Sequence, residues 1–313
     1  MSIIRALASR SLYVMASGVF IGLAAPGLAE WAAPVLPYTV AAMMTIAAIR
    51  ISAKDFADTL RRWHVVTSLV VWLLVVSPLV VLGVTWLIQP PAQIAMALIM
   101  TAACPPLMST VGLAWMLGFN PPLALAVVMS ATLICPLVLS AVVGAFPLAG
   151  ISLEPFELFL RLSSLVLGSY CLAMVLRRAL GPERVARWTD EWDLATVSAL
   201  LLFAVAVMDG VWTRATNDPG YVLLLLGVAF GTNLLHQVAG FWIARRLGRS
   251  SAMTMAFASG ARAVGILLAV APGGAESDLV LFFALYQFPM YILPVVLRRV
   301  YSSAAISDAS EKS

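Results

Sequence analysis

One arginine, Arg262, lies where a charged side chain is costly. It stands about ten residues into an apolar segment that runs from 252 to 271, and a guanidinium near the middle of a membrane costs between about 3 and more than 10 kcal/mol. At this depth the side chain cannot easily reach the interface. Three roles would justify the cost: the charge neutralises free backbone carbonyls, attracts an anionic substrate, or does both in turn.

The same segment is interrupted, as is one in the first half of the chain. Cys104–Pro106 breaks an apolar run that resumes at Thr110, and Ser259–Arg262 precedes Gly265. Proline lacks a backbone donor, and freed backbone groups survive in a membrane only against protein or a wet cavity. The two breaks predict a site where the half-helix ends meet; the alternative is two simple kinks. The residues assigned to this crossover are Arg262, Cys104, Pro105, Pro106, Ser109, Thr110, Ser259, Gly260, Gly265, Ser130, Thr132, Tyr286 and Gln287.

Two further ionisable side chains lie inside apolar segments. Asp209 falls near the end of its segment, and His236 shares a segment with Asn233 and Gln237. Because histidine ordinarily titrates near physiological pH, His236, Asn233 and Asp209 are candidates for a proton relay. The alternatives are an interfacial acid at Asp209 and, around His236, a polar patch that holds helices together.

No metal, cofactor or catalytic centre is predicted. The three cysteines lie in apolar runs without CxxC or Cys/His pairing, and the sequence contains no HExxH motif and no nucleophile with a placed base, so we expect no enzyme. The chain is 62% hydrophobic and 11% charged, against roughly 25% charged in soluble domains. This composition excludes a soluble enzyme, and the short, scattered basic clusters exclude a nucleic-acid partner.

The elements that must position these residues are membrane helices. A span needs about 20 mostly apolar residues, and ten such stretches follow one another. They lie near 12–29, 33–50, 64–88, 92–118, 122–147, 153–178, 193–213, 218–243, 252–271 and 277–299. The first stretch alternatively resembles a signal peptide cleaved near Gly27–Ala29.

The predicted fold is an all-α polytopic membrane protein with ten transmembrane helices. Five helices in each half, 1–150 and 151–313, give the second half the opposite orientation in the bilayer, so we expect two inverted repeats with broken, crossing helices 4 and 9. Sixteen of the 19 basic residues fall in loops on one face. By the positive-inside rule both termini are cytoplasmic, in a plasma (inner) membrane protein.

Several stretches resemble a known transporter family. Ile51–Phe56 with Leu60–Arg62 is similar to its loop after helix two, Cys104–Val111 with Leu123–Pro136 to its helices four and five, and Gly260–Leu267 to its helix nine. The family is that of the bile acid:sodium symporters, within the superfamily of bile, arsenite and riboflavin-type transporters. The resemblance implies a panel domain rocking against a core domain, each assembled from both halves, with the crossover in the core and small organic anions as substrates.

The resemblance fails where sodium-coupled relatives hold two Na⁺ ions. At the positions that correspond to the sodium-binding side chains of these relatives, this chain has Val111, Ala124, Val128, Ala258, Leu73 and Arg262. Thr110 is the one such position where a hydroxyl is kept, because it replaces a family serine. Hard cations need oxygen ligands, which valine, alanine and leucine side chains lack. We therefore expect that sodium coupling is lost and that Arg262 supplies the positive charge in its place.

These observations favour a secondary transporter that moves a small organic anion by alternating access without bound sodium. Coupling to protons, to a counter-substrate or to neither stays open. One alternative is a sodium-coupled anion symporter with backbone ligands, and another is a non-transporting membrane sensor or scaffold. The expected partners are the substrate and the lipid bilayer.

Overall fold

The computed structural model describes residues 11–50, 63–116, 118–146, 154–270 and 277–297. Within these ranges the regular structure is helical, and one isolated pair of extended residues joins two segments. The loop at 51–62, which carries part of the family resemblance, and the basic residues near both termini lie outside the described residues. The helical prediction is confirmed for the part that the structure describes.

The helices of the first half are α2 (Ser11–Ala24), α3 (Pro26–Ala32), α4 (Leu36–Ile49), α6 (Trp63–Val71), α7 (Ser77–Ile88), α8 (Ala92–Ala103), α9 (Ser109–Met116) and α10 (Pro121–Ala145). Those of the second half are α11 (Pro155–Leu180), α12 (Pro182–Arg187), α13 (Thr189–Ala206), α14 (Val211–Asn217), α15 (Pro219–Ala244), α16 (Arg249–Gly260), α17 (Gly265–Val270), α18 (Asp278–Leu285) and α19 (Gln287–Val296). Two 3₁₀ turns, η1 (Ala33–Val35) and η4 (Arg245–Leu247), and one π-helical turn, η3 (Trp72–Val76), extend neighbouring helices.

Six helical stretches are long and apolar enough to cross a membrane. They are Pro26–Ile49, Trp63–Ile88, Pro121–Ala145, Pro155–Leu180, Thr189–Asn217 and Pro219–Leu247. The other predicted spans fall on shorter or divided helices, namely α2, α8 with α9, α16 with α17, and α18 with α19. Length and composition therefore support a polytopic membrane protein.

Two of the long helices, α10 and α15, begin at a capping residue followed by proline. Asn120 accepts a hydrogen bond from the backbone N–H of Leu123 through its side chain, and Asp218 does the same for Tyr221. Each is followed by proline at the first helical position, where the missing N–H has no helical partner to lose. These caps set where α10 and α15 start.

The predicted span at 193–213 is not a single helix. α13 ends at Ala206, and Gly210 then adopts a positive φ of 71° before α14 begins. Glycine tolerates this backbone conformation because it has no Cβ. Asp209 therefore lies, half-buried, in the turn between the two helices.

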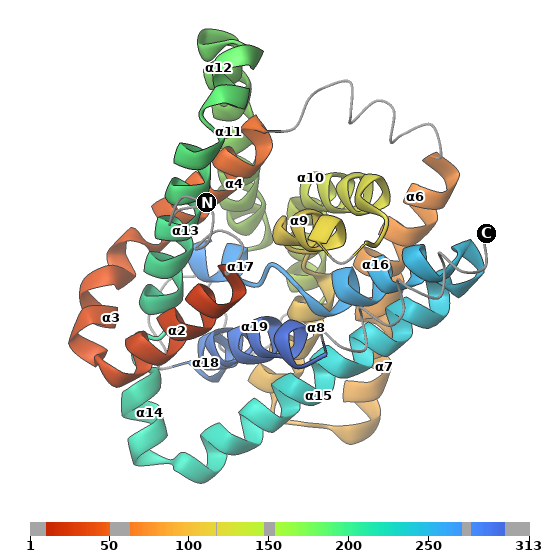
Figure 1. The fold of residues 1–313 in the computed structure, drawn as a ribbon. Helices are drawn as coiled ribbons and strands as arrows, with labels where there is room; N and C mark the ends of the chain where they lie inside the picture. Colours follow the sequence, from red (N-terminus) through yellow and green to blue (C-terminus); the bar gives the residue numbers. More distant parts are fainter. Residues whose placement is uncertain (1–10, 51–62, 117, 147–153, 271–276, 298–313) are drawn as a thin grey trace.

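The helices form two groups with α17–α19 between them. Figure 1 shows α2–α4 and α11–α14 on one side and α6–α10 and α16 on the other, with α15 running below α18 and α19 from α14 toward α16. In the first group α13 packs against α2, α3 and α4. α2 approaches α13 closely because Gly18 and Gly22 present no side chain to Ala204 and Val205.

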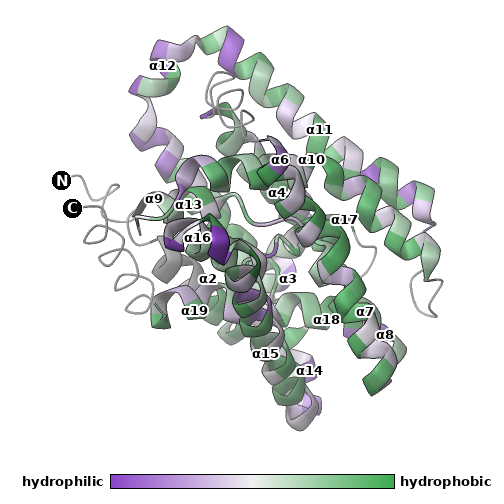
Figure 2. Ribbon diagram, turned by 90° about the vertical axis from the view of Figure 1, so that its right-hand side faces the viewer, coloured by the Kyte–Doolittle hydropathy of each residue, from purple (hydrophilic) through white to green (hydrophobic). Residues whose placement is uncertain are grey.

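The outer surface is apolar. Figure 2 shows hydrophobic residues along most of the length of α7, α11 and α15, and hydrophilic ones gathered at α12. Large side chains such as Tyr38, Trp86 and Leu87 are more than 70% exposed, at 74%, 78% and 79%. Exposed apolar area on this scale suits a hydrocarbon surround rather than water.

Candidate functional site

The two interruptions lie where the sequence predicts them and meet in space. α8 ends at Ala103 and α16 at Gly260, and the extended connections that follow form an antiparallel pair between Pro106 and Arg262. Leu107 N–H donates to the Ala261 carbonyl and Ala263 N–H donates to the Pro105 carbonyl, both at 2.8 Å. This crossover pairs backbone groups that the breaks set free, so the two simple kinks are excluded.

The guanidinium of Arg262 is enclosed by the ends of these helices. The residue is 0% exposed. Nε donates to the carbonyl of Ser259 at 2.7 Å, and Nη1 donates to the carbonyls of Cys104 at 2.8 Å and Leu73 at 3.2 Å. Nη2 donates to the hydroxyl of Ser77 at 3.1 Å. The cation thus lies at the carbonyl ends of α8 and α16, where helix dipoles concentrate negative potential.

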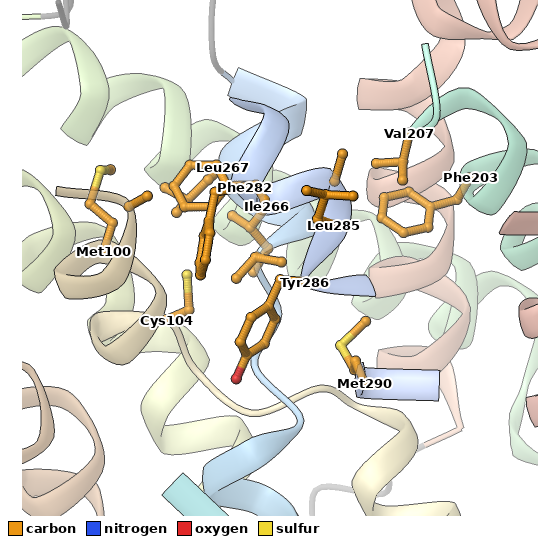
Figure 3. Close-up of a cluster of buried hydrophobic side chains, with 14 of the residues drawn as sticks. Met100, Cys104, Phe203, Val207, Ile266, Leu267, Phe282, Leu285, Tyr286 and Met290 are labelled. Carbon is orange, nitrogen blue, oxygen red and sulfur yellow. The ribbon is translucent and has the colours of Figure 1, made fainter. Parts of the chain in front are cut away.

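A second set of donors caps the last carbonyl of α16. The carbonyl of Gly260 accepts from Asn233 Nδ2 at 2.9 Å and from the hydroxyl of Tyr286 at 3.0 Å. Figure 3 shows that hydroxyl directed toward the extended connections. Gln237 in turn donates to Asn233 Oδ1 at 2.7 Å. Asn233 thus joins α15 to the end of α16, whereas neither ring nitrogen of His236 has a hydrogen-bond partner among the described residues.

A cavity of about 990 Å³ is lined by residues of the crossover and of both helix groups. Its lining comes from α4 and α13, from α9 and α10, and from the crossover, α17 and α19. Its lining is mostly apolar, and of the predicted site residues it includes Pro106, Ser109, Thr132, Gly265 and Gln287. This is the size and character of a site for an organic molecule.

The other predicted site residues are not part of this lining. Those assigned to the crossover are Arg262, Cys104, Pro105, Thr110, Ser259, Gly260, Ser130 and Tyr286, and those assigned to the relay are His236, Asn233 and Asp209. Arg262 is fully buried and directs its charge at backbone carbonyls, so direct attraction of a substrate by Arg262 is disfavoured. In the part of the chain that the structure describes, Arg262 forms no ion pair with Asp209.

Sequence reasoning missed several lining residues. Arg50 lies at the rim and forms an ion pair with Asp193 at 2.5 Å, but in the sequence it is only one of a loop's basic residues. Tyr291 lines the cavity one turn after Gln287, a spacing that could have been read from the sequence. The lining methionines are Met43, Met44, Met108 and Met290, and nothing in an apolar run distinguishes them.

Apart from Arg262 and Thr110, the positions matched with sodium ligands carry apolar side chains. Ala124, Val128 and Ala258 are 0% exposed and carry no side-chain oxygen. Leu73 contributes only its backbone carbonyl, which accepts from Arg262. Among the described residues no cluster of three His, Cys, Asp or Glu side chains is placed to hold a metal ion.

A polar cluster joins both helix groups at the end of the molecule away from Arg50. Arg214 of α14 forms an ion pair with Asp278 of α18. Tyr221 donates to the second carboxylate oxygen of Asp278 at 3.0 Å, and the backbone N–H of Asp278 donates to Gln93 at 3.0 Å. In Figure 1, α14 lies at the lower end, whereas α4 ends at the upper end near α12. The cluster therefore ties the groups together opposite the cavity rim.

The fold and this site define a polytopic α-helical membrane protein built around two broken, crossing helices, an architecture used by many secondary transporters. Residues 11–299 match the SBF-like CPA transporter family, and the chain belongs to that family. It is also 23% identical, over 228 residues, to the Bacillus subtilis (strain 168) protein named "uncharacterized sodium-dependent transporter YocS". That alignment covers 72% of this chain and 70% of the relative. These findings confirm the resemblance to the bile acid:sodium symporter superfamily, and family membership points to transport rather than catalysis.

Proposed function

We propose that this chain is a secondary transporter of a small organic anion, that it works by alternating access, and that Arg262 takes the place of a bound cation. The observation that carries the proposal is the buried guanidinium on the carbonyl ends of α8 and α16, in a crossover whose Pro106 and Ala263 line a cavity of about 990 Å³. An internal cation stabilises the crossover permanently, so no ion needs to enter with the substrate.

The same proposal includes the membrane arrangement. The broken helices are the fourth element of each half if α2, α3–α4, α6–α7, α8–α9 and α10 correspond to α11, α13–α14, α15, α16–α17 and α18–α19. Ten crossings in two inverted repeats, 1–150 and 151–313, follow from that correspondence. We propose on the same basis that the basic loops and both termini face the cytoplasmic side of the plasma membrane.

An organic anion suits the cavity for two reasons. The lining is rich in methionine and leucine, which accommodate an apolar body. Ser109 begins α9 at the cavity wall, so the positive end of that helix dipole faces the ligand, and Arg50 adds a cation at the rim. The combination favours an apolar molecule with a negatively charged end.

Sodium coupling through backbone ligands is the first alternative, and the name of the Bacillus relative, a sodium-dependent transporter, favours it for that protein. In this chain the carbonyls of Leu73, Cys104 and Ser259 already accept hydrogen bonds from Arg262. A sodium ion would have to displace a cation that is covalently part of the chain. We therefore favour sodium independence.

The melting temperature of the purified protein is expected to be the same in NaCl, KCl and choline chloride at equal ionic strength. A ligand that binds only the folded state stabilises it by about 2.7 kcal/mol at one hundred times its dissociation constant, so an occupied sodium site would be visible. A rise specific to sodium would restore the sodium-coupled symporter.

Alternating access is tested with a cysteine in the cavity. We expect Ser109→Cys, combined with Cys171→Ser to remove the exposed cysteine, to react with a membrane-impermeant thiol reagent from either face of the membrane. Thr216→Cys, exposed on α14 near the Arg214 cluster, is the control and should react from one face only. Labelling of Ser109→Cys from a single face would favour a scaffold that keeps this fold without transporting.

A further inference from the structure

The polar cluster at the α14 end of the molecule contains an ion pair that leaves the first group of helices. Two other ion pairs among the described residues stay inside that group, because one joins α4 to α13 and the other lies within α11. In the cluster, Arg214 of α14 pairs with Asp278 at the start of α18. Arg214 thus connects the first group to a helix outside it.

Asp278 is fixed to the other helices by two further contacts. Its backbone N–H donates to Gln93 Oε1 of α8 at 3.0 Å, and the hydroxyl of Tyr221, at the start of α15, donates to its second carboxylate oxygen at 3.0 Å. A carboxylate held by α8 and α15 therefore meets an arginine held by α14. Any separation of the two helix groups at this end must break the pair between Arg214 and Asp278.

The cavity extends to the opposite end of the molecule. Its lining reaches Arg50, where α4 ends, and includes none of the four residues of the polar cluster. Along α13 toward α14, Phe203 and Val207 belong to the same buried apolar cluster as Ile266 and Leu285, as Figure 3 shows. Apolar contact is not directional and lets helices slide, whereas hydrogen bonds need a fixed geometry. The polar cluster is therefore the contact that holds the α14 end in one position.

We propose that Arg214 and Asp278, supported by Tyr221 and Gln93, form a latch that keeps the cavity closed on the α14 side of the membrane and that releases when the cavity opens there. The inference rests on the proposed function, because a latch acts only if the two helix groups rock. It adds to that function which contact sets the balance between the two open states.

The exposure of the pair suits a contact that breaks and re-forms in every cycle. The side chains of Arg214 and Asp278 are 36% and 28% exposed, so water solvates both charges when the latch opens. A fully buried pair would leave uncompensated charges and would be costly to separate. A pair of this exposure changes the ratio of the two states about fivefold, which converts to about 1 kcal/mol.

The test measures how fast a membrane-impermeant thiol reagent labels Ser109→Cys, in the Cys171→Ser background, from each face of the membrane. Right-side-out and inside-out vesicles present the two faces separately. We expect Asp278→Asn and Arg214→Gln each to raise the labelling rate from the α14 side about fivefold, because the rate follows the population of the state open to that side. The rate from the Arg50 side should not rise.

Two further variants separate the latch from a general loss of stability. Glu157→Gln breaks an exposed ion pair within one helix, α11, and should leave both labelling rates unchanged. The double variant Arg214→Asp with Asp278→Arg restores an ion pair of reversed polarity and should return the α14-side rate toward that of the wild type. Faster labelling from both faces in Asp278→Asn would mean that the fold has loosened, and would overturn the latch.

The remaining outcomes distinguish the latch from the proposed function. Labelling from both faces at rates that Asp278→Asn and Arg214→Gln do not change overturns the latch and leaves alternating access standing. Labelling from the Arg50 side alone, in the wild type and in both latch variants, contradicts alternating access and the latch together.

Discussion

Replacement of Arg262 by glutamine is expected to abolish transport and to lower the melting temperature more than any other single change described for this protein. After the substitution, the shorter glutamine amide is the one side chain left to donate hydrogen bonds to the carbonyls of Ser259, Cys104 and Leu73. Each buried group left without a partner costs about 1–3 kcal/mol, and the relief from no longer burying the charge offsets part of that loss. A net destabilisation of about 2 kcal/mol or more follows, measured by thermal unfolding in detergent.

Arg262→Lys separates charge from geometry. Lysine keeps the positive charge but loses the planar fork that reaches four partners, so we expect it to restore stability partly and transport poorly. Arg178→Gln, an exposed arginine at the end of α11, is the control and should change the melting temperature little.

Sodium gives the Arg262 substitution a distinctive signature. Because Arg262→Gln frees carbonyl oxygens that suit a hard cation, we expect this variant, unlike the wild type, to melt at a higher temperature in NaCl than in choline chloride. Wild-type uptake and stability in Arg262→Ala would contradict the assigned role.

Gly240→Ala is expected to be the second most damaging change. A Cβ at this position of α15 would overlap the hydroxyl of Ser259 and the backbone carbonyl of Met255 on α16. A backbone carbonyl cannot rotate away, so α16 must move, and overpacking of this kind costs about 1–3 kcal/mol. Because α16 ends at the crossover, ligand binding should weaken along with the melting temperature.

Gly231→Ala on the same helix is the matched control. Within the described part of the chain no atom lies within 4 Å of a Cβ built there, and alanine is a better helix former than glycine by about 0.5–1 kcal/mol. The melting temperature of Gly231→Ala should therefore stay the same or rise. If both variants melt together, α15 and α16 do not depend on close packing at Gly240.

Some predictions came from the resemblance to a transporter family, and others came from individual residues such as the prolines. Pro105 and Pro106 cannot continue a helix, so the first break could be predicted from the residues alone. The second break, before Gly265, was predicted from a similar interruption in the second half of the chain. The end of α13 at Ala206 was not readable, because the apolar run continues past Gly210 and hydropathy does not register a positive φ. Tyr291 was missed because an aromatic residue in an apolar run is usually core.

The class of protein, the helical fold and the two helix breaks were predictable from the residues alone. Hydropathy and proline chemistry act over a few neighbouring residues, and no distant contact can reverse them in an apolar surround. The directions of the charge and of the polar groups depended on the tertiary structure. Arg262 turns to the carbonyls of Cys104, Ser259 and Leu73 rather than to the cavity, because donors and acceptors far apart in sequence meet only once the helices cross, and burial makes each of them pair.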